Sequence, residues 1–430
     1  GADARTIARL AVPALGTLAA DPLVTLIDTA FVGRLGPEAL AALGVDAAIF
    51  SLAFIAFNFL QYGVTPMTGS LVGAGRADEA VGVVRHALAI ALGLGLVVAA
   101  LLVVFAEPLV GLMAAPPETV EGAVAYLRIR AWAAPAVMVV MAGNGAFRGH
   151  QDTVTPLRLT LLLNAVNLVL DPLLIFGFDW GLEGAAVATL IAQVVGAAGF
   201  LISMARRGHV SLGPVTADGL RPFVKVGWEL AVRTGSLVLT ITVAARVAAS
   251  IGTTAIAAHQ VAMQVWFFLA LSTDALAIAA QSLVSLYLGK QDEPGAEATA
   301  RTLLRWGVAV GLALTVLVVV LRPWLGSWFS TDAEVVGTIS HLLVWVAALQ
   351  LPGALVFVYD GVYLGASRFG LQAIVTASAS AVAIGLLVTG GRLDWGVDGV
   401  WLGVTVMVLG RRVALAWLQA AGRMLSPRVP

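Results

Sequence analysis

The residues best suited to chemistry lie in one apolar stretch, NAVNLVLDPLLIF, at positions 164–176. Asn164, Asn167 and Asp171 follow the spacing i, i+3, i+7, which places all three side chains on one face of a helix. Pro172 follows at once, and because proline has no amide hydrogen, the carbonyl of Leu168 loses its helical donor. A carboxylate and two amides in such a segment predict a site for a proton or a hard cation.

The rest of the chain is as apolar as this stretch. Of its 430 residues, 60% are hydrophobic and 12% are charged, and its mean hydropathy is +0.95. A soluble domain is about a quarter charged, and no soluble fold of this length could bury so much apolar surface. The composition therefore predicts an all-α, multi-pass membrane protein, and we expect no cleavable signal peptide. The absence of cysteine excludes disulfides, thiol catalysis and cysteine-bound metals.

Apolar runs and chain breakers predict twelve transmembrane helices. Their expected limits are 7–33, 38–70, 79–106, 119–147, 153–177, 182–206, 220–250, 254–288, 296–321, 334–366, 369–390 and 397–422. Several runs exceed the roughly 20 residues that a bilayer requires, so those helices must tilt, bend or project. Pro13, Pro66 and Pro135 are the expected bend points, because proline removes a backbone hydrogen bond.

The distribution of basic residues predicts the orientation in the membrane. The loops from even to odd spans carry twelve basic residues, and those from odd to even spans carry three, Arg34, Arg322 and Arg392. The twelve are Arg76, Arg85, Arg148, Arg158, Arg206, Arg207, Arg221, Lys225, Lys290, Arg301, Arg305 and Arg368. We therefore expect a protein of the cell inner (plasma) membrane with both termini cytoplasmic, near Arg5 and Arg9 at one end and Arg423 and Arg428 at the other.

The two halves of the sequence repeat each other. LGPEALAA (35–42) matches IGTTAIAA (251–258) at an offset of 216, and WGLEGAA (180–186) matches WGVDGVW (395–401) at 215. The first offset also aligns Gly73 with Gly289, Gly145 with Gly361 and Gly149 with Gly365. Because six is an even number, two six-helix repeats both enter the membrane from the same side. The expected fold is two pseudo-symmetric six-helix lobes around a central cleft, with lobes at 1–207 and 220–430 and a linker at 208–219.

The repeat also separates the polar residues of the two lobes. Asn144 aligns with Asp360 and Asn58 with Asp274, whereas Asp28 aligns with Ala244 and Asp171 with Leu387. Each lobe thus carries its own ionisable set.

The first lobe has a second acid at mid-span, Asp28, and Asp21 lies about two turns before it. A charged carboxylate at the bilayer centre costs roughly 3 kcal/mol or more and usually faces a cavity. Two carboxylates that share a site can exchange a proton near neutral pH. Asn144 and Thr189 are further polar groups at comparable depth. For Asn164 and Thr189 taken singly, inter-helix hydrogen bonding is the favoured role.

The second lobe has Arg233, Asp274 and Asp360 in its predicted first, second and fourth helices. An intramembrane arginine needs a partner. The favoured interpretation is therefore a structural ion pair or triad, and a role in proton coupling or substrate binding stays open. Gln264 and Gln281 could line the same space.

Six stretches resemble the multidrug and toxic compound extrusion (MATE) transporters, in their DinF-like branch. They are LAVP (10–13), LIDTAFVGRLG (26–36), GNGAFRGHQDTVTP (143–156), NAVNLVLDPLLIFG (164–177), GWELAVRTGS (227–236) and VYDGVYLGA (358–366). The resemblance covers nearly the whole chain, and the combination is highly specific.

The resemblance implies alternating access and export of organic cations, driven by inward H⁺ or Na⁺. It implies that Asp28, Asn167 and Asp171 form the cation site and that polar positions around the site match Tyr126, Asn144 and Thr189. Pro13 matches a helix-1 proline that bends in some members. The chain departs from the family at Leu237, where the NorM-like branch has a carboxylate, and at Gln281, where many DinF-like members have Glu.

The functional hypothesis is an antiporter in which Asp171, with Asp28 and Asn167, exchanges H⁺ or Na⁺ for the exported compound. We expect small-molecule and lipid partners, no nucleic acid, no cofactor and a monomer. Pro13 and Pro172 would provide the conformational change.

Three other functions are alternatives to the antiporter: a lipid flippase, a channel and an enzyme. A flippase for lipid-linked precursors would want a cationic cleft, and Arg233 is the only basic residue that we expect deep inside a lobe. A channel would show ring-forming repeats or a selectivity filter, and neither appears in the sequence. An enzyme is not expected, because the five histidines lack metal-protease spacing and no nucleophile elbow or phosphate loop is present.

Overall fold

The computed structural model describes residues 1–422 and 425, and within them all regular structure is helical. Twelve helical spans are long and apolar enough to cross a membrane. The twelve-helix, all-α prediction is confirmed. Arg423 and Arg428, two of the residues behind the predicted placement of the C-terminus, lie outside the described residues.

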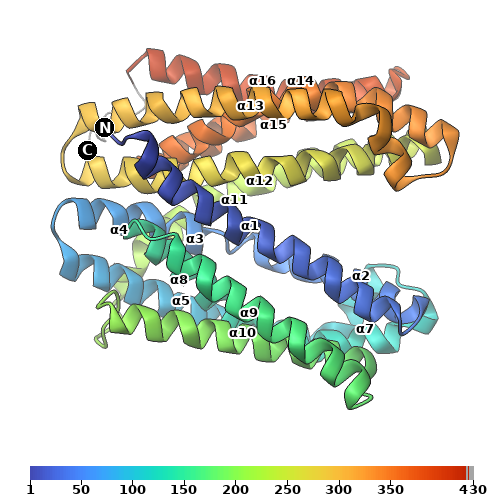
Figure 1. Cartoon of the computed structure of the whole chain (residues 1–430), viewed down its shortest axis with the longest axis horizontal. Helices are drawn as coiled ribbons and strands as arrows, with labels where there is room; N and C mark the ends of the chain where they lie inside the picture. The colour runs from blue at the N-terminus through green and yellow to red at the C-terminus, as the bar shows by residue number, and fades with distance from the viewer. Residues whose placement is uncertain (423–424, 426–430) are drawn as a thin grey trace. The chain divides into compact units, whose positions relative to one another are not determined.

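The chain packs as two compact units, and residues 12–227 make up the first unit. Its helices are α1 (Ala4–Gly33, whose first turns belong to the second unit), α2 (Pro37–Ile55), α3 (Phe59–Tyr62), α4 (Val64–Gly73), α5 (Ala77–Val104), α6 (Ala106–Leu112), α7 (Pro117–Arg130), α8 (Ala134–Gly149), α9 (Val154–Pro172) and α10 (Gly181–Arg206) (Figure 1). A 3₁₀ turn (Ala131–Ala133) separates α7 from α8, and a π-helical turn (Leu173–Gly177) follows α9.

The second unit combines residues 1–11 with residues 228–430. Its helices are α11 (Ala217–Ile251, which begins in the first unit), α12 (Thr253–Gly289), α13 (Glu293–Phe329), α14 (Ala333–Gly365), α15 (Phe369–Arg392) and α16 (Gly396–Ala420). The N-terminal residues thus pack with the second half of the chain, where Ala2 donates a backbone hydrogen bond to Thr299 Oγ1 at 2.9 Å. The functional division into lobes at 1–207 and 220–430 stays a prediction.

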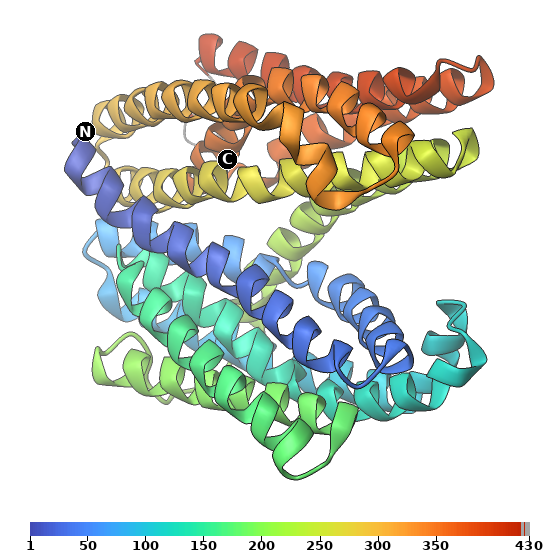
Figure 2. The same ribbon diagram turned by 45° about the vertical axis from the view of Figure 1, so that its right-hand side comes forward.

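Helical structure is interrupted near two of the expected bend points, Pro66 and Pro135, and continues through the third, Pro13. The second span is broken between α2 and α4, just before Pro66, and the 3₁₀ turn in the fourth span lies directly before Pro135. By contrast, α1 runs as one helix through Pro13 and Pro22 (Figure 2). A proline deletes the donor for the carbonyl one turn earlier, which explains why both breaks lie on the N-terminal side of the proline.

The backbone repeats the duplication seen in the sequence. Six pairs of left-handed residues recur at offsets of 214 to 216. The pairs are Gly36 and Gly252, Gly75 and Gln291, Gln151 and Ser367, Asp179 and Asp394, Gly181 and Gly396, and Gly208 and Gly422. A left-handed conformation is uncommon outside glycine, so its recurrence at matching turns shows that both halves use the same connections.

The repeated glycines allow equivalent helices to cross closely. A Cβ atom on Gly145 in α8 would lie 2.9 Å from the Gln61 carbonyl oxygen. In the other half, a Cβ atom on Gly361 in α14 would lie 2.2 Å from the Ala277 carbonyl oxygen in α12. These atoms belong to backbone, which cannot rotate away, so both positions require glycine.

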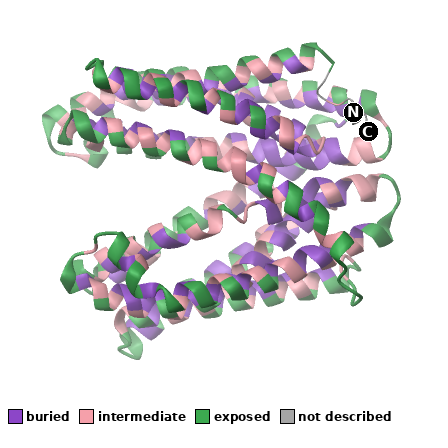
Figure 3. Cartoon of the chain, turned by 180° about the vertical axis from the view of Figure 1, so that it is seen from behind, coloured by how far each residue is buried: buried purple, intermediate pink, exposed green. Residues whose placement is uncertain are grey.

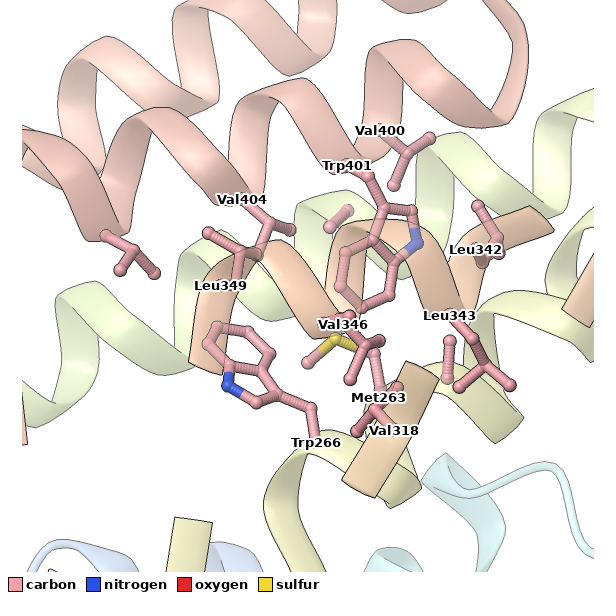
Figure 4. Close-up of a cluster of buried hydrophobic side chains, with 14 of the residues drawn as sticks. Met263, Trp266, Val318, Leu342, Leu343, Val346, Leu349, Val400, Trp401 and Val404 are labelled. Atoms are coloured by element: carbon pink, nitrogen blue, oxygen red, sulfur yellow. The ribbon is translucent and has the colours of Figure 1, made fainter. Parts of the chain in front are cut away.

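Each unit has an apolar core of its own. In the second unit Trp266 and Trp401 pack with their ring centroids 6.2 Å apart beside Met263, Leu342 and Val346 (Figure 4). In the first unit the core joins α1, α2, α5, α7 and α10 around Tyr126. Large apolar side chains are also exposed along the helices, and the loops at the helix ends are exposed (Figure 3). This distribution suits a lipid environment.

Candidate functional site

The centre of the first unit is an amide that bridges two carboxyl groups. Asn167 Nδ2 donates to Asp28 Oδ1 at 2.9 Å and to Asp171 Oδ2 at 3.1 Å. Because both oxygens bind one nitrogen, they are no more than about 6 Å apart. The face predicted for α9 extends to a second contact with α1, because Asn164 Nδ2 lies 3.4 Å from Asp21 Oδ1.

Burial and unused acceptors distinguish this bridge from a simple structural contact. Asn167 is 3% exposed and Asp171 is 1% exposed. Asp171 Oδ1 and Asn167 Oδ1 receive no hydrogen bond from any described residue. A buried acceptor without a donor carries a desolvation penalty, so the site favours a proton or another cation.

The bridge also holds the two carboxyl groups close to each other. Two carboxylates this close cannot both be charged at low cost. A single proton between them, or a bound cation, relieves the repulsion.

Local backbone geometry places Asp171 at this point. Regular α9 ends at Pro172, and the chain continues through the π-helical turn Leu173–Gly177. Gly184 of α10 packs against this turn, where a Cβ atom would lie 2.8 Å from the Leu174 carbonyl oxygen. The turn and its glycine contact thus fix the end of α9.

The other residues of the predicted cation site lie in the same unit, with different contacts. Tyr126 in α7 is 2% exposed, and its hydroxyl reaches Thr189 in α10. Thr189 Oγ1 also donates to the Ala185 carbonyl at 3.1 Å, the ordinary helical role. Asn144 is buried in α8, and its Oδ1 atom has no partner among the described residues.

Two ionisable residues near this site were missed in the sequence. Asp46 in α2 is fully buried, and neither carboxyl oxygen has a hydrogen-bond partner among the described residues. The guanidinium of Arg130 lies 4.2 Å from the centre of the Phe50 ring and within electrostatic range of both Asp28 and Asp46. Both residues fall inside predicted spans, so the presence of an ionisable group in an apolar run could have identified them in the sequence.

In the second unit the predicted ion pair is present with an additional partner. Asp360 Oδ2 accepts from Arg233 at 2.6 Å and from Arg411 at 2.6 Å, and Asp360 Oδ1 accepts from Arg411 at 2.8 Å. Asp274 lies half-buried in α12 and is itself partnered. The expectation that Arg233 is the only basic residue deep inside a lobe is wrong, because Arg411 is 5% exposed and Arg130 is half-buried.

The second unit also contains an apolar cavity of about 100 Å³. Its wall includes Trp266, Phe267, Met407 and Leu237, and Arg411 is its charged member. Arg411 Nε has no partner among the described residues. Of the two predicted glutamines, Gln281 is buried and partnered, whereas Gln264 is exposed.

An acidic pocket of about 410 Å³ lies at the ends of α2, α7 and α10 that the charge distribution predicts to be outside. Glu38, Glu118, Glu121 and Glu183 line it together with Trp180. Among the described residues, no group of three or more metal-binding side chains converges.

Two histidines that follow α8 and α10, His150 and His209, are not suited to proton exchange near neutral pH. His150 and His209 stack with ring centroids 3.6 Å apart. Burial, followed by the charges of His150 and Arg207, lowers the pKa of His209 to about 4. Burial also lowers the pKa of His150. Both imidazoles are therefore neutral at neutral pH, and they pack as an uncharged pair.

Comparisons with known proteins agree on one family. A family model described as MatE matches the chain twice, at residues 13–173 and 233–389. Protein DETOXIFICATION 44, chloroplastic, of Arabidopsis thaliana is 35% identical over 429 residues, which cover 96% of this chain and 81% of that protein. DNA damage-inducible protein F of Escherichia coli strain K12 is 25% identical over 425 residues, with coverage of 95% and 90%.

The fold agrees as well. An outward-facing structure of a multidrug resistance MATE family transporter superposes with a TM-score of 0.87 at 23% identity, covering 97% of this chain and 95% of that one. The double match of the family model follows the duplication that the sequence and the backbone both show.

Proposed function

This chain belongs to the MatE family of multidrug and detoxification transporters, and we propose that it is a secondary active antiporter that exports lipophilic organic cations in exchange for H⁺. Family and fold are those of transporters and not of enzymes. The observation that supports a cation-coupled mechanism is the Asp28–Asn167–Asp171 bridge. It holds two carboxyl groups together but offers them one amide donor.

A bridge of this kind is better suited to binding a proton than to holding the structure together. A structural carboxylate in an apolar interior is normally paired and fully hydrogen-bonded, as Asp360 is in the second unit. Asp171 has the opposite environment, with one oxygen that has no donor among the described residues. Na⁺ would bind the same oxygens, and the experiment below distinguishes the two ions.

The substrate class is supported by charge and by shape. The acidic pocket of the first unit attracts cations. The cavity of the second unit is lined mainly by aromatic and aliphatic side chains. Broad apolar pockets with few polar groups accept many lipophilic molecules. Arg411, which lines this cavity, and Arg233 both bind Asp360, which argues against the alternative of a flippase for anionic lipid-linked precursors.

The exchange cycle follows from the properties of the carboxyl pair. Uptake of a proton from outside removes one of the two negative charges of the Asp28–Asp171 pair, and α1 then changes shape near Pro13 and releases the exported compound outward. Loss of the proton to the cytoplasm restores affinity for the next substrate. Coupling requires only that the proton and the substrate have different affinities for the two states. We propose in addition that the protein is a monomer of the inner membrane with both termini in the cytoplasm, as the distribution of basic residues predicts.

The proposal is tested by efflux from proteoliposomes loaded with a fluorescent lipophilic cation. We expect an imposed pH gradient to drive efflux by the wild type, and an imposed Na⁺ gradient to drive none. Asp171→Asn should lower the pH-driven rate at least about tenfold, because the amide cannot take up a proton. The matched control is Asp78→Asn, a neutralised acid in an exposed first turn of α5, which should retain the wild-type rate.

Two outcomes would contradict the proposal. Efflux that follows only the Na⁺ gradient would replace H⁺ with Na⁺ as the coupling ion. Efflux by Asp171→Asn with an unchanged dependence on pH would remove this carboxyl from the coupling mechanism.

A further inference from the structure

Asp46 is a buried acid of the first unit that takes no part in the bridge. It lies in α2 between Ala42, one turn before it, and Phe50, one turn after it, and all three side chains are buried. Its side chain is 0% exposed, and both carboxyl oxygens lack a hydrogen-bond donor among the described residues. A carboxylate in this position would be neither hydrated nor paired, which carries a large desolvation cost. The arrangement therefore fits the neutral, protonated acid.

The nearest available cation is Arg130. Its guanidinium lies 4.2 Å from the centre of the Phe50 ring, and Phe50 follows Asp46 by one helical turn on the same face of α2. Arg130 is thus held by a cation–π contact and makes no salt bridge within 4.0 Å to any described residue. Because residues four apart on a helix have their Cβ atoms about 5–6 Å apart, we infer that a change of the Arg130 rotamer can bring the guanidinium from Phe50 to Asp46.

We propose that Asp46 is a second proton-binding carboxyl group, and that Arg130 moves from Phe50 to pair with Asp46 when the proton leaves. The O–H bond of the Asp46 carboxyl breaks, the proton passes to water, and the guanidinium takes its place as the counter-charge. No other bond forms or breaks. The role of this step in transport rests on the proposed antiport, but the step itself does not.

The charged groups around Asp46 leave Arg130 as its only candidate counter-ion in the described residues. From α7, Tyr126 and Arg130 approach it, and from α1 Asp28 shares the field of Arg130. Arg128 of α7 is already paired, through a 3.0 Å contact with Glu107 of α6. The remaining groups on α2 and α7 are the acids of the outer pocket, Glu38, Glu118 and Glu121.

The acidic pocket gives the proton a short route. Ala42 lines this pocket and lies one turn before Asp46 on α2. Ala39, Gly122 and Ala125 line it as well, so the wall on this side consists of small side chains. The glutamates raise the local concentration of cations. Protons would therefore reach Asp46 from the predicted outer side, independently of Asp171.

The test is infrared difference spectroscopy of purified protein, recorded while the pH is raised from about 5 to about 10. A protonated aspartic acid has a carbonyl stretching band that shifts in deuterated water and disappears when the proton leaves. We expect Asp46→Asn to lack one component of that band and Asp171→Asn to lack a different one. Asp46→Asn has the shape of the neutral acid, so we expect it to fold.

Arg130 supplies the second arm of the test. In Arg130→Gln the Asp46 band should persist to a proton concentration at least about tenfold lower than in the wild type, because no cation replaces the proton. Arg130→Lys should restore part of the wild-type behaviour. Arg128→Gln is the matched control, because Arg128 is an exposed arginine on the same helix that pairs with Glu107, and it should leave the Asp46 band unchanged.

The inference fails if Asp46→Asn shows the same carbonyl bands as the wild type, or if Arg130→Gln leaves the Asp46 band unchanged. Should Asp46→Asn not fold, the Arg130 variants decide the question alone. None of these measurements requires transport. A failure of the proposed antiport would appear in the liposome experiment, whereas a failure here would appear only in the spectra.

Discussion

At the scale of single residues, this protein uses buried acids in two different ways. Asp360 in the second unit receives hydrogen bonds from two arginines, whereas Asp171 and Asp46 have carboxyl oxygens without donors among the described residues. Full pairing fixes a charge in place, and missing donors leave room for a proton. The same residue type thus serves structure in one unit and is suited to exchange in the other.

Asp360 provides a prediction about stability. Asp360→Asn leaves Arg411 buried without its counter-charge, and breaking a buried pair in this way costs about 3–5 kcal/mol. We expect a marked fall in the thermal unfolding midpoint of the purified protein in detergent. The control is Asp398→Asn, which disrupts an exposed pair with His341 and should cost at most about 1 kcal/mol. Equal unfolding midpoints for the two variants would show that Asp360 does not stabilise the fold.

Sequence reasoning at this scale succeeded where spacing carried the information. The spacing of Asn164, Asn167 and Asp171 predicts one helical face, and in the structure that face meets Asp21 and Asp28 of α1. It failed where two distant helices had to be combined. Arg411 lies in a span whose sequence does not reveal that it meets Asp360. The position of Asp46 in an apolar run marks it as unusual, but its complete burial without a hydrogen-bond donor among the described residues is known only from the structure.

At the scale of elements, glycine determines how closely the helices approach. Gly145 and Gly149 of α8 contact α3 and α4, and Gly361 and Gly365 of α14 contact α12. The sequence predicts these pairs as a repeat but does not predict which helices cross there, because that depends on the packing of the whole unit. The breaks before Pro66 and Pro135 were predictable, since proline acts on its own helix.

The close crossing of α12 and α14 gives a second stability prediction. In Gly361→Ala the new Cβ atom would lie 2.2 Å from the Ala277 carbonyl oxygen, and overpacking of this kind typically costs about 1–3 kcal/mol. Gly385→Ala in α15 is the matched control, because nothing lies within 4 Å of its Cβ position. That change should be neutral, or stabilising by about 0.4–1 kcal/mol. Thermal unfolding of both variants checks the difference, and a Gly361→Ala protein as stable as the control would refute the assigned crossing.

At the scale of the whole molecule, the duplication explains the architecture but not the chemistry. Both halves share the same left-handed turns and the same glycine crossings. The bridge of Asp28, Asn167 and Asp171 has no counterpart in the second half, where the repeat places Ala244 and Leu387 opposite the two acids. Proton exchange is accordingly proposed for one unit, while the aromatic cavity beside Arg411 lies in the other.

The central claim is that substrate and proton compete through Asp171, and it is tested by measuring the protons released when substrate binds. Tetraphenylphosphonium would be added to purified protein in weakly buffered solution at about pH 7, and release would be followed with a pH indicator. We predict that the wild type releases protons upon binding and that Asp171→Asn binds the cation with little or no release. Equal proton release by both proteins would contradict the account.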